Sequence, residues 1–371
     1  MAPGRPPARG QAVQGRLYYR NLAAFEPGRT DQRARVTTCS RYDDVLLPPL
    51  PAIPGMVTDS ECRYLYWLTA TQYTGQGAVV ELGTWLGRST LHLAAGLRDA
   101  GYPDALDCFD QFVWRGNHAR AATLPLQRGD DFQPYFESNV RPVYPRLRVT
   151  KAAIEAIVWP GRPIEILFLD APKRLDTFSA TLAAFAPALV PGVSRIVFQD
   201  FLHPPAFALP AVVACLGPAL EAEHVVADGV TVGFRVKEPL PYGTAQPIDW
   251  NFWTWSAEEI VDEFERLLAP LPAEARACLW LSAALLLVDR REGAAAREIA
   301  ERVGADAALR PHLQAHAGAF LYDNYRGLHR AAGLDRPDRR LPPAKAVRTA
   351  LRRTRAAVRR WLRPPGAFGT A

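Results

Sequence analysis

The stretch AVVELGTWLGRST, at residues 78–90, decides how the rest of the sequence is interpreted. Residues 78–82 form a short apolar run that only Glu81 interrupts, which is typical of a buried strand. Gly83 and Gly87 follow in a turn, and a helix is expected over residues 89–97 with Ser89 and Thr90 as its cap. A strand, a glycine-containing turn and a helix in this order predict the first unit of a parallel α/β sheet.

The same alternation of strands and helices continues to about residue 236. Strands are expected at 105–109, 147–150, 164–169 and 195–198, and helices at 131–140, 175–189 and 206–216. Two last strands, at 224–227 and 231–236, flank Asp228-Gly229, which is a strong hairpin signal. We therefore predict a doubly wound, mostly parallel sheet with helices on both faces and an antiparallel hairpin at one edge.

The 371 residues divide into four segments by composition. Residues 1–40 are expected to be a flexible basic arm. Residues 41–236 would hold the sheet and an N-terminal approach segment, whose helix begins at Thr58-Asp59-Ser60. Residues 237–330 are predicted to be a helical extension, and residues 331–371 a basic tail. The longest nearly apolar run, Ala277 to Val288, is too short to span a bilayer and indicates a buried helix.

Charge is distributed unevenly along the chain. The net charge is +6, but residues 1–40 carry +5 and residues 331–371 carry +9, which leaves −8 for the segment between them. A nucleic-acid groove would place basic residues inside the folded region, so this distribution argues against a nucleic-acid partner. No apolar stretch of signal-peptide length stands at the N-terminus, and we expect a cytoplasmic protein.

The tail contains an amphipathic pattern between two proline pairs. Five apolar residues fall on one helical face, and six arginines occupy the remainder: Val347, Leu351, Val358, Trp361 and Leu362, with Arg348, Arg352, Arg353, Arg355, Arg359 and Arg360. Such a helix is typical of a peripheral binder of anionic membranes, here at the inner surface. A helix docked on its own domain, with a solvated basic face, is the alternative.

Ligands of open parallel sheets bind beyond the carboxyl ends of the strands, so the residues that follow each strand are the candidate site. Gly83 and Gly87 would let the backbone approach a ligand, and Ser89 would offer a donor at a helix N-terminus. Asp110 follows the second strand, where a carboxylate can accept both hydroxyls of a ribose. The glycine spacing fits neither the dinucleotide fingerprint nor the P-loop.

These residues resemble the class I, Rossmann-like S-adenosylmethionine-dependent methyltransferases over roughly residues 52 to 236. The likeness is greatest to small-molecule O-methyltransferases of the catechol and macrocin types. The resemblance implies S-adenosylmethionine as cofactor, with Gly83 and Gly87 lining its methionine part and Asp110 holding its ribose. Glu81 and Ser89 are the other expected cofactor-binding residues.

The resemblance also implies a metal site after the fourth and fifth strands. Catechol-type enzymes carry Asp-x-x-Lys at the first place, where this chain has Asp170 and Lys173. There the aspartate binds a divalent metal such as Mg²⁺ and the lysine helps to deprotonate the acceptor. Gln199 and Asp200 would complete the metal site, although Gln199 replaces a carboxylate. Burial would have to lower the pKa of Lys173 for it to act as the base.

Three functions remain open from the sequence. The first is methylation of a small-molecule or sugar hydroxyl, with Mg²⁺ assistance undecided. The second is a catalytically inactive cofactor-binding protein, and the third is a nucleic-acid methyltransferase, which the basic ends suggest and the acidic middle opposes. His203 is an alternative base, whereas the spacing of His312 and His316 is attributed to coincidence. The oligomeric state stays open.

Overall fold

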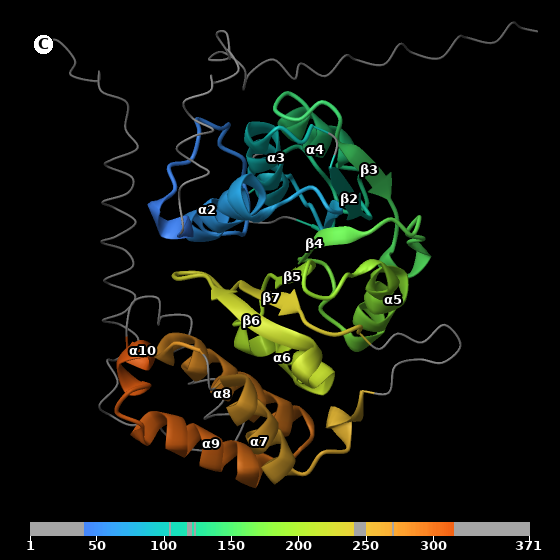
Figure 1. Cartoon of the computed structure of the whole chain (residues 1–371). Coiled ribbons are helices and arrows are strands. Elements are labelled where there is room, and N and C mark those ends of the chain that lie inside the picture. The colour runs from blue at the N-terminus through green and yellow to red at the C-terminus, as the bar shows by residue number, and fades with distance from the viewer. Residues whose placement is uncertain are drawn as a thin grey trace, which may run out of the picture.

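The computed structural model describes residues 41–103, 105–116, 121, 124–240, 250–268 and 271–314. The proposed arm at 1–40, the tail at 331–371 and His316 lie outside these residues. Within the described part, a seven-stranded sheet has the order β3-β2-β1-β4-β5-β7-β6 (Figure 1). The strands are β1 (Ala78–Leu82), β2 (Leu106–Asp110), β3 (Arg148–Lys151), β4 (Ile164–Leu169), β5 (Arg195–Phe198), β6 (Leu220–Val225) and β7 (Val232–Val236).

Strand pairing confirms the predicted fold class. β1 pairs in parallel with β2 and β4, while β5 pairs antiparallel with β7, so the hairpin β6–β7 is added at one edge. The order of strands reverses between β1 and β4, and the loops after these two strands therefore flank the switch point. The predicted bounds of β1, β4 and β5 agree with the structure, because each strand is apolar except for one residue: Glu81, Glu165 and Arg195.

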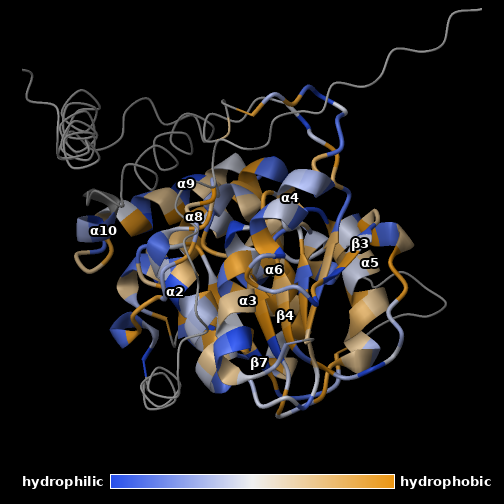
Figure 2. Cartoon of the chain, turned by 90° about the horizontal axis from the view of Figure 1, so that it is seen from above, coloured by the Kyte–Doolittle hydropathy of each residue, from blue (hydrophilic) through white to orange (hydrophobic). Residues whose placement is uncertain are grey.

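Helices cover both faces of the sheet. Alternate residues of a strand face opposite sides of the sheet. Ile166 and Phe168 therefore pack under the helices at 59–67, 88–100 and 133–140, whereas Leu167 and Leu169 pack under those at 175–185 and 208–216. Figure 2 shows the strands as a mainly hydrophobic centre. The helices are α2 (Asp59–Trp67), α3 (Arg88–Ala100), α4 (Gln133–Val140), α5 (Leu175–Phe185), α6 (Ala208–Leu216), α7 (Ala257–Leu268), α8 (Ala273–Asp289), α9 (Gly293–Ala305) and α10 (Arg310–Gln314).

The predicted N-cap agrees with the structure for α2 but not for α3. Thr58 caps α2, and Glu61 completes a capping box by accepting from the backbone N–H of Thr58 at 2.7 Å. The predicted cap of α3 is wrong. Gly87, in the left-handed region at φ +95°, is its N-cap residue, because the tight turn from β1 needs that conformation. The hydroxyl of Ser89 donates to Glu81 instead.

Helices α7 and α8 pack against α6, and α9 packs against α8, on the side of the molecule away from α2 and α3 (Figure 1). The predicted apolar helix lies within α8, and its residues belong to the same hydrophobic cluster as one face of the sheet. Among the described residues, no helix combines the length and the hydropathy needed to cross a membrane.

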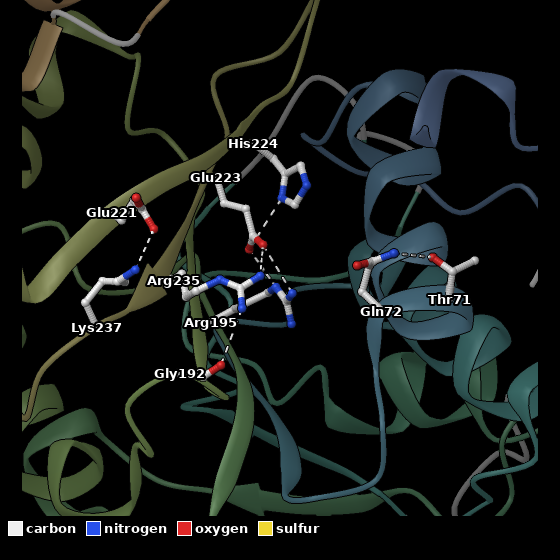
Figure 3. Close-up of polar contacts among 9 residues, drawn as sticks. All are labelled: Thr71, Gln72, Gly192, Arg195, Glu221, Glu223, His224, Arg235 and Lys237. Atoms are coloured by element: carbon white, nitrogen blue, oxygen red, sulfur yellow. Dashed lines mark hydrogen bonds and ion pairs between the residues drawn. The ribbon is translucent and has the colours of Figure 1, made fainter. Parts of the chain in front are cut away.

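A network of ion pairs ties the edge strands together (Figure 3). Glu223 of β6 accepts from Arg195 of β5 at 2.7 Å and also pairs with Arg235 of β7. Burial raises the pKa of Glu223, but the hydrogen bonds from the two arginines outweigh it and lower the pKa. Arg195 is the first residue of β5, so this network lies toward the amino end of that strand. The candidate site lies at the opposite, carboxyl ends of the strands.

Candidate active site

The loop after β1 follows a strained path around Gly83 and Gly87. Gly83 has φ +87°, and a Cβ placed on it would lie 2.8 Å from the backbone nitrogen of Ala171, in the loop after β4. A Cβ on Gly87 would lie 2.7 Å from Val140. Trp85 between them also has a positive φ, of 44°. These contacts explain why the chain needs glycine at both predicted positions.

Asp110 lies at the carboxyl end of β2 and closes this loop from the other side. Its carboxylate accepts from the backbone N–H groups of Thr84 at 2.9 Å, Trp85 at 3.1 Å and Phe112 at 2.8 Å. An ionised carboxylate has about four acceptor positions. The Thr84 hydroxyl also donates to it, at 3.5 Å, so all four positions are engaged within the chain. Asp110 is only partly buried, and a ribose hydroxyl that reached it would share or displace one of these contacts.

Glu81 lies in the interior of the sheet, behind the loop. Its side chain is fully buried and accepts from the Ser89 hydroxyl at 2.6 Å. Burial raises the pKa of Glu81 to about 7, against the opposing effect of the Ser89 hydrogen bond. Glu81 and Ser89 thus join the end of β1 to the first turn of α3, beneath the predicted cofactor position.

A polar cluster forms where β4 and β5 end, as the sequence predicted. The amine of Lys173 donates to three side chains: to Asp170 Oδ1 at 3.1 Å, to Gln199 Oε1 at 3.2 Å and to Asp200 Oδ2 at 2.6 Å. Asp200 has a positive φ of 64°, which turns the chain sharply after β5. The structure therefore brings together all four residues expected at this place.

The ionisation of Lys173 differs from the sequence expectation. Burial lowers the pKa of Lys173, but the carboxylates of Asp170 and Asp200 outweigh burial, and the pKa is raised. The expectation of a near-neutral amine is wrong, because the same fold that buries the lysine gives it two anionic partners. Burial raises the pKa of Asp170 to about 6; Lys173 opposes this rise and Asp200 adds to it.

The three residues expected to hold a divalent metal do not fit one in this arrangement. Asp170, Gln199 and Asp200 each accept a hydrogen bond from the Lys173 amine, which lies among their oxygens. Mg²⁺ requires oxygen ligands at about 2.0–2.1 Å and would have to displace that amine. Within the described ranges, no group of three His, Cys, Asp or Glu side chains is arranged to hold a metal ion.

His203 lies one turn beyond Asp200, and its backbone N–H donates to the Asp200 carbonyl at 3.0 Å. Burial lowers the pKa of this imidazole and Lys173 lowers it further, while Asp200 opposes both. A largely neutral imidazole beside the cluster is consistent with the alternative base named from the sequence.

Sequence reasoning missed residues whose role depends on long-range contacts. Glu61 is almost fully buried and accepts from the backbone N–H of Val230 at 2.9 Å and from the Thr231 hydroxyl at 2.7 Å. It therefore fastens α2 to the hairpin turn. The S/T-x-x-E capping pattern could have identified Glu61 as a helix-start residue, but no local pattern predicts the hairpin contact.

An aromatic pair flanks Asp110. The rings of Trp85 and Trp114 are stacked at an interplanar angle of 11°, with centroids 6.1 Å apart. The indole N–H of Trp114 is buried and has no hydrogen-bond partner in the described part of the chain. The pair forms a rigid apolar wall beside the glycine loop.

Residues 80–201 match a family model described as a methyltransferase domain. No curated protein matches the chain in sequence. This match and the observed strand order identify a Rossmann-like methyltransferase fold.

Several solved structures resemble the chain distantly. The calicheamicin methyltransferase CalS11 is 16% identical with a TM-score of 0.38, over 62% of this chain and 99% of that one. The O-methyltransferase NovP is 15% identical with a TM-score of 0.37, over 51% and 84%. The 23S rRNA methyltransferase ErmE is 17% identical with a TM-score of 0.31, over 73% and 100%.

Proposed function

With a methyltransferase domain at residues 80–201 as the premise, we propose that the chain transfers the methyl group of S-adenosylmethionine to a hydroxyl of a small molecule or sugar. The acceptor oxygen would form a bond to the methyl carbon while the carbon–sulfur bond breaks. The electron pair of the carbon–sulfur bond would go to sulfur, and the products would be a methyl ether and S-adenosylhomocysteine. The protein's task is then to align donor and acceptor and to take up the hydroxyl proton.

One observation carries this proposal: the glycine loop and the polar cluster are joined directly. The backbone N–H groups of Asp170 and Ala171 both donate to the carbonyl of Leu82, the residue before Gly83, at 2.9 and 3.0 Å. A cofactor on the loop would therefore be adjacent to an acceptor at the cluster. Methyl transfer needs this proximity, because the reacting atoms must be held within about 3–3.5 Å.

The cluster also supports a hydroxyl as the acceptor group. Asp170 and Asp200 retain free acceptor positions for an incoming O–H. Because Lys173 is protonated, the proton would pass to a carboxylate, and Asp170 with its pKa of about 6 is best matched to this task at neutral pH. The net charge of −8 between residues 41 and 330 favours a small acceptor over a nucleic acid.

The proposal is tested in two steps. Calorimetric titration of the full chain with S-adenosylmethionine and S-adenosylhomocysteine should show one site for each ligand. Incubation with methyl-labelled cofactor and a panel of phenols, sugars and nucleotide sugars should then label one hydroxyl class. Failure of both ligands to bind would overturn the proposal. Binding without transfer to any hydroxyl or nucleic-acid acceptor would favour an inactive cofactor-binding protein.

A further inference from the structure

The polar cluster already contains a cation. An ammonium group has three N–H donors, and Lys173 directs one to each of Asp170, Gln199 and Asp200. A divalent metal at this place would take its ligands from the same three side chains. Lys173 follows Asp170 by three residues, so the short loop after β4 holds the amine close to the end of β5.

The Lys173 ammonium offsets one of the two negative charges of the cluster without a metal. Two carboxylates face one ammonium, and a side-chain amide supplies the third oxygen. Gln199 is buried and neutral, where a carboxylate would have favoured a divalent ion. A metal entering this site would meet the repulsion of a tethered positive charge that already engages one oxygen of each of these side chains.

We propose that the Lys173 ammonium is the resident cation of this site and that it replaces a divalent metal. This inference rests on the proposed function, in which the cluster receives the acceptor. In this role Lys173 is a positioning residue: it keeps the carboxylates of Asp170 and Asp200 together at the ends of β4 and β5. It also places a fixed positive charge near the acceptor oxygen, which favours loss of the hydroxyl proton before the methyl group is transferred.

Metal binding provides a test that does not depend on methyl transfer. Mn²⁺ is titrated into the full chain, in the absence of S-adenosylmethionine, and followed by calorimetry and by its electron paramagnetic resonance. The unaltered chain should show no Mn²⁺ site tighter than millimolar. Lys173→Ala should gain a site at least tenfold tighter, because three oxygens lose their cation. The double variant Asp170→Asn with Lys173→Ala should lose that site again.

A matched control separates this effect from the loss of any lysine. Lys237 pairs with Glu221 at 3.3 Å on the edge hairpin, so Lys237→Ala also frees a carboxylate. This variant should bind no more Mn²⁺ than the unaltered chain. Methyl transfer should be unchanged by a chelator, and Lys173→Arg, which keeps the charge, should retain more of kcat than Lys173→Ala.

Two results would overturn the inference. The first is a Mn²⁺ site tighter than millimolar in the unaltered chain that Asp170→Asn removes, which would show that a metal displaces the lysine. The second is a folded Lys173→Ala variant with no gain of Mn²⁺ binding. If Lys173→Ala does not fold, the first comparison still decides. Cofactor binding and methyl transfer are measured separately, so failure of the proposed function is recognised by those two assays and not by Mn²⁺ binding.

Discussion

At the residue scale, Gly83 combines two constraints that can be separated. Its φ of +87° disfavours any side chain, and the space beside it is taken by the backbone of Ala171. Gly161, at φ +79°, has the same conformational requirement but no atom within 4 Å of an added Cβ. Substitutions at Gly83 and Gly161 therefore separate the effect of backbone strain from the effect of displacing the loop after β1.

We expect Gly83→Ala to weaken S-adenosylmethionine binding by at least about tenfold, which corresponds to about 1.4 kcal/mol. The added Cβ forces the loop after β1 away from the loop after β4. Gly161→Ala should lower the free energy of unfolding by about 1–2 kcal/mol and leave the cofactor affinity unchanged. Calorimetric titration measures both affinities. Equal affinity in Gly83→Ala and the unaltered chain would show that the cofactor lies elsewhere.

Glu81 predicts a specific dependence of stability on pH. Its pKa rises from 4.5 in the unfolded chain to about 7 in the folded one. Between these values the folded state holds a proton that the unfolded state releases, so the free energy of unfolding falls as pH rises from 4.5 to 7. The contribution of this one group is about 3 kcal/mol over that range.

Glu81→Gln removes this titration and keeps the size of the side chain. The free energy of unfolding of the unaltered chain, relative to Glu81→Gln, should therefore decrease between pH 4.5 and 7 and level off above pH 7. Urea unfolding at several pH values measures the difference between the two free energies of unfolding. The pH-dependent contributions of other carboxylates, such as Asp170, are common to both chains and cancel in this difference. A difference that is flat, or that grows with pH, would contradict a protonated Glu81.

At the scale of elements, Glu61 connects the start of α2 to the β6–β7 hairpin. Glu259 provides a natural comparison, because it forms the same kind of capping box with Ser256 at the start of α7, at 2.6 and 3.1 Å, but is exposed. The two glutamates differ in burial and in the additional contacts with Val230 and Thr231.

We expect Glu61→Ala to lower the free energy of unfolding by about 3 kcal/mol or more. The variant leaves the N–H of Thr58, the N–H of Val230 and the hydroxyl of Thr231 without their acceptor, and an unsatisfied buried donor costs about 1–3 kcal/mol. Glu259→Ala should cost only about 0.5–1 kcal/mol, because water can replace its oxygen. Chemical denaturation measures both values, and similar losses would contradict a special role of the hairpin contact.

At the scale of the whole molecule, the helical extension and the sheet share one apolar core. Leu286 of α8 and Phe198 of β5 are both fully buried and belong to the same cluster. A shared core couples the unfolding of the parts that form it. The extension and the sheet are therefore expected to unfold together.

Leu286→Ala should lower the free energy of unfolding by about 2–5 kcal/mol through loss of contacts and the remaining cavity. Calorimetry should still show one transition for the folded part, and S-adenosylmethionine should raise its midpoint. A variant in which the extension melts separately, while the cofactor-stabilised transition keeps its midpoint, would show that the two parts are independent.

The basic tail gives a prediction for the full chain, although it lies outside the described residues. We expect the full chain to sediment with anionic liposomes and a chain ending at Pro343 to remain in solution. Each basic residue near an anionic leaflet contributes about 1 kcal/mol, and the attraction weakens with salt. Both chains should bind S-adenosylmethionine equally. Equal sedimentation, or loss of folding on truncation, would favour a tail helix docked on its own domain.

The sequence by itself determined the order of elements and the residues that end the strands. Runs such as Ile164–Leu169, apolar except for Glu165, are recognisable locally, because a strand buried on both faces consists mainly of apolar residues. Once these strands are parallel, Gly83, Asp110, Asp170 and Asp200 must follow neighbouring strand ends. That is why the main residues of the candidate site could be predicted.

Only the tertiary structure decided how those residues interact. The pKa of Lys173 depends on two carboxylates, one of them from a different strand, and Glu61 meets Thr231 across 170 positions of sequence. Gly87 replaces Ser89 as the cap of α3 because the turn geometry, and not the preference of the residue, sets the start of the helix. Burial and electrostatic energies depend on every neighbour in space, and local sequence patterns specify only neighbours along the chain.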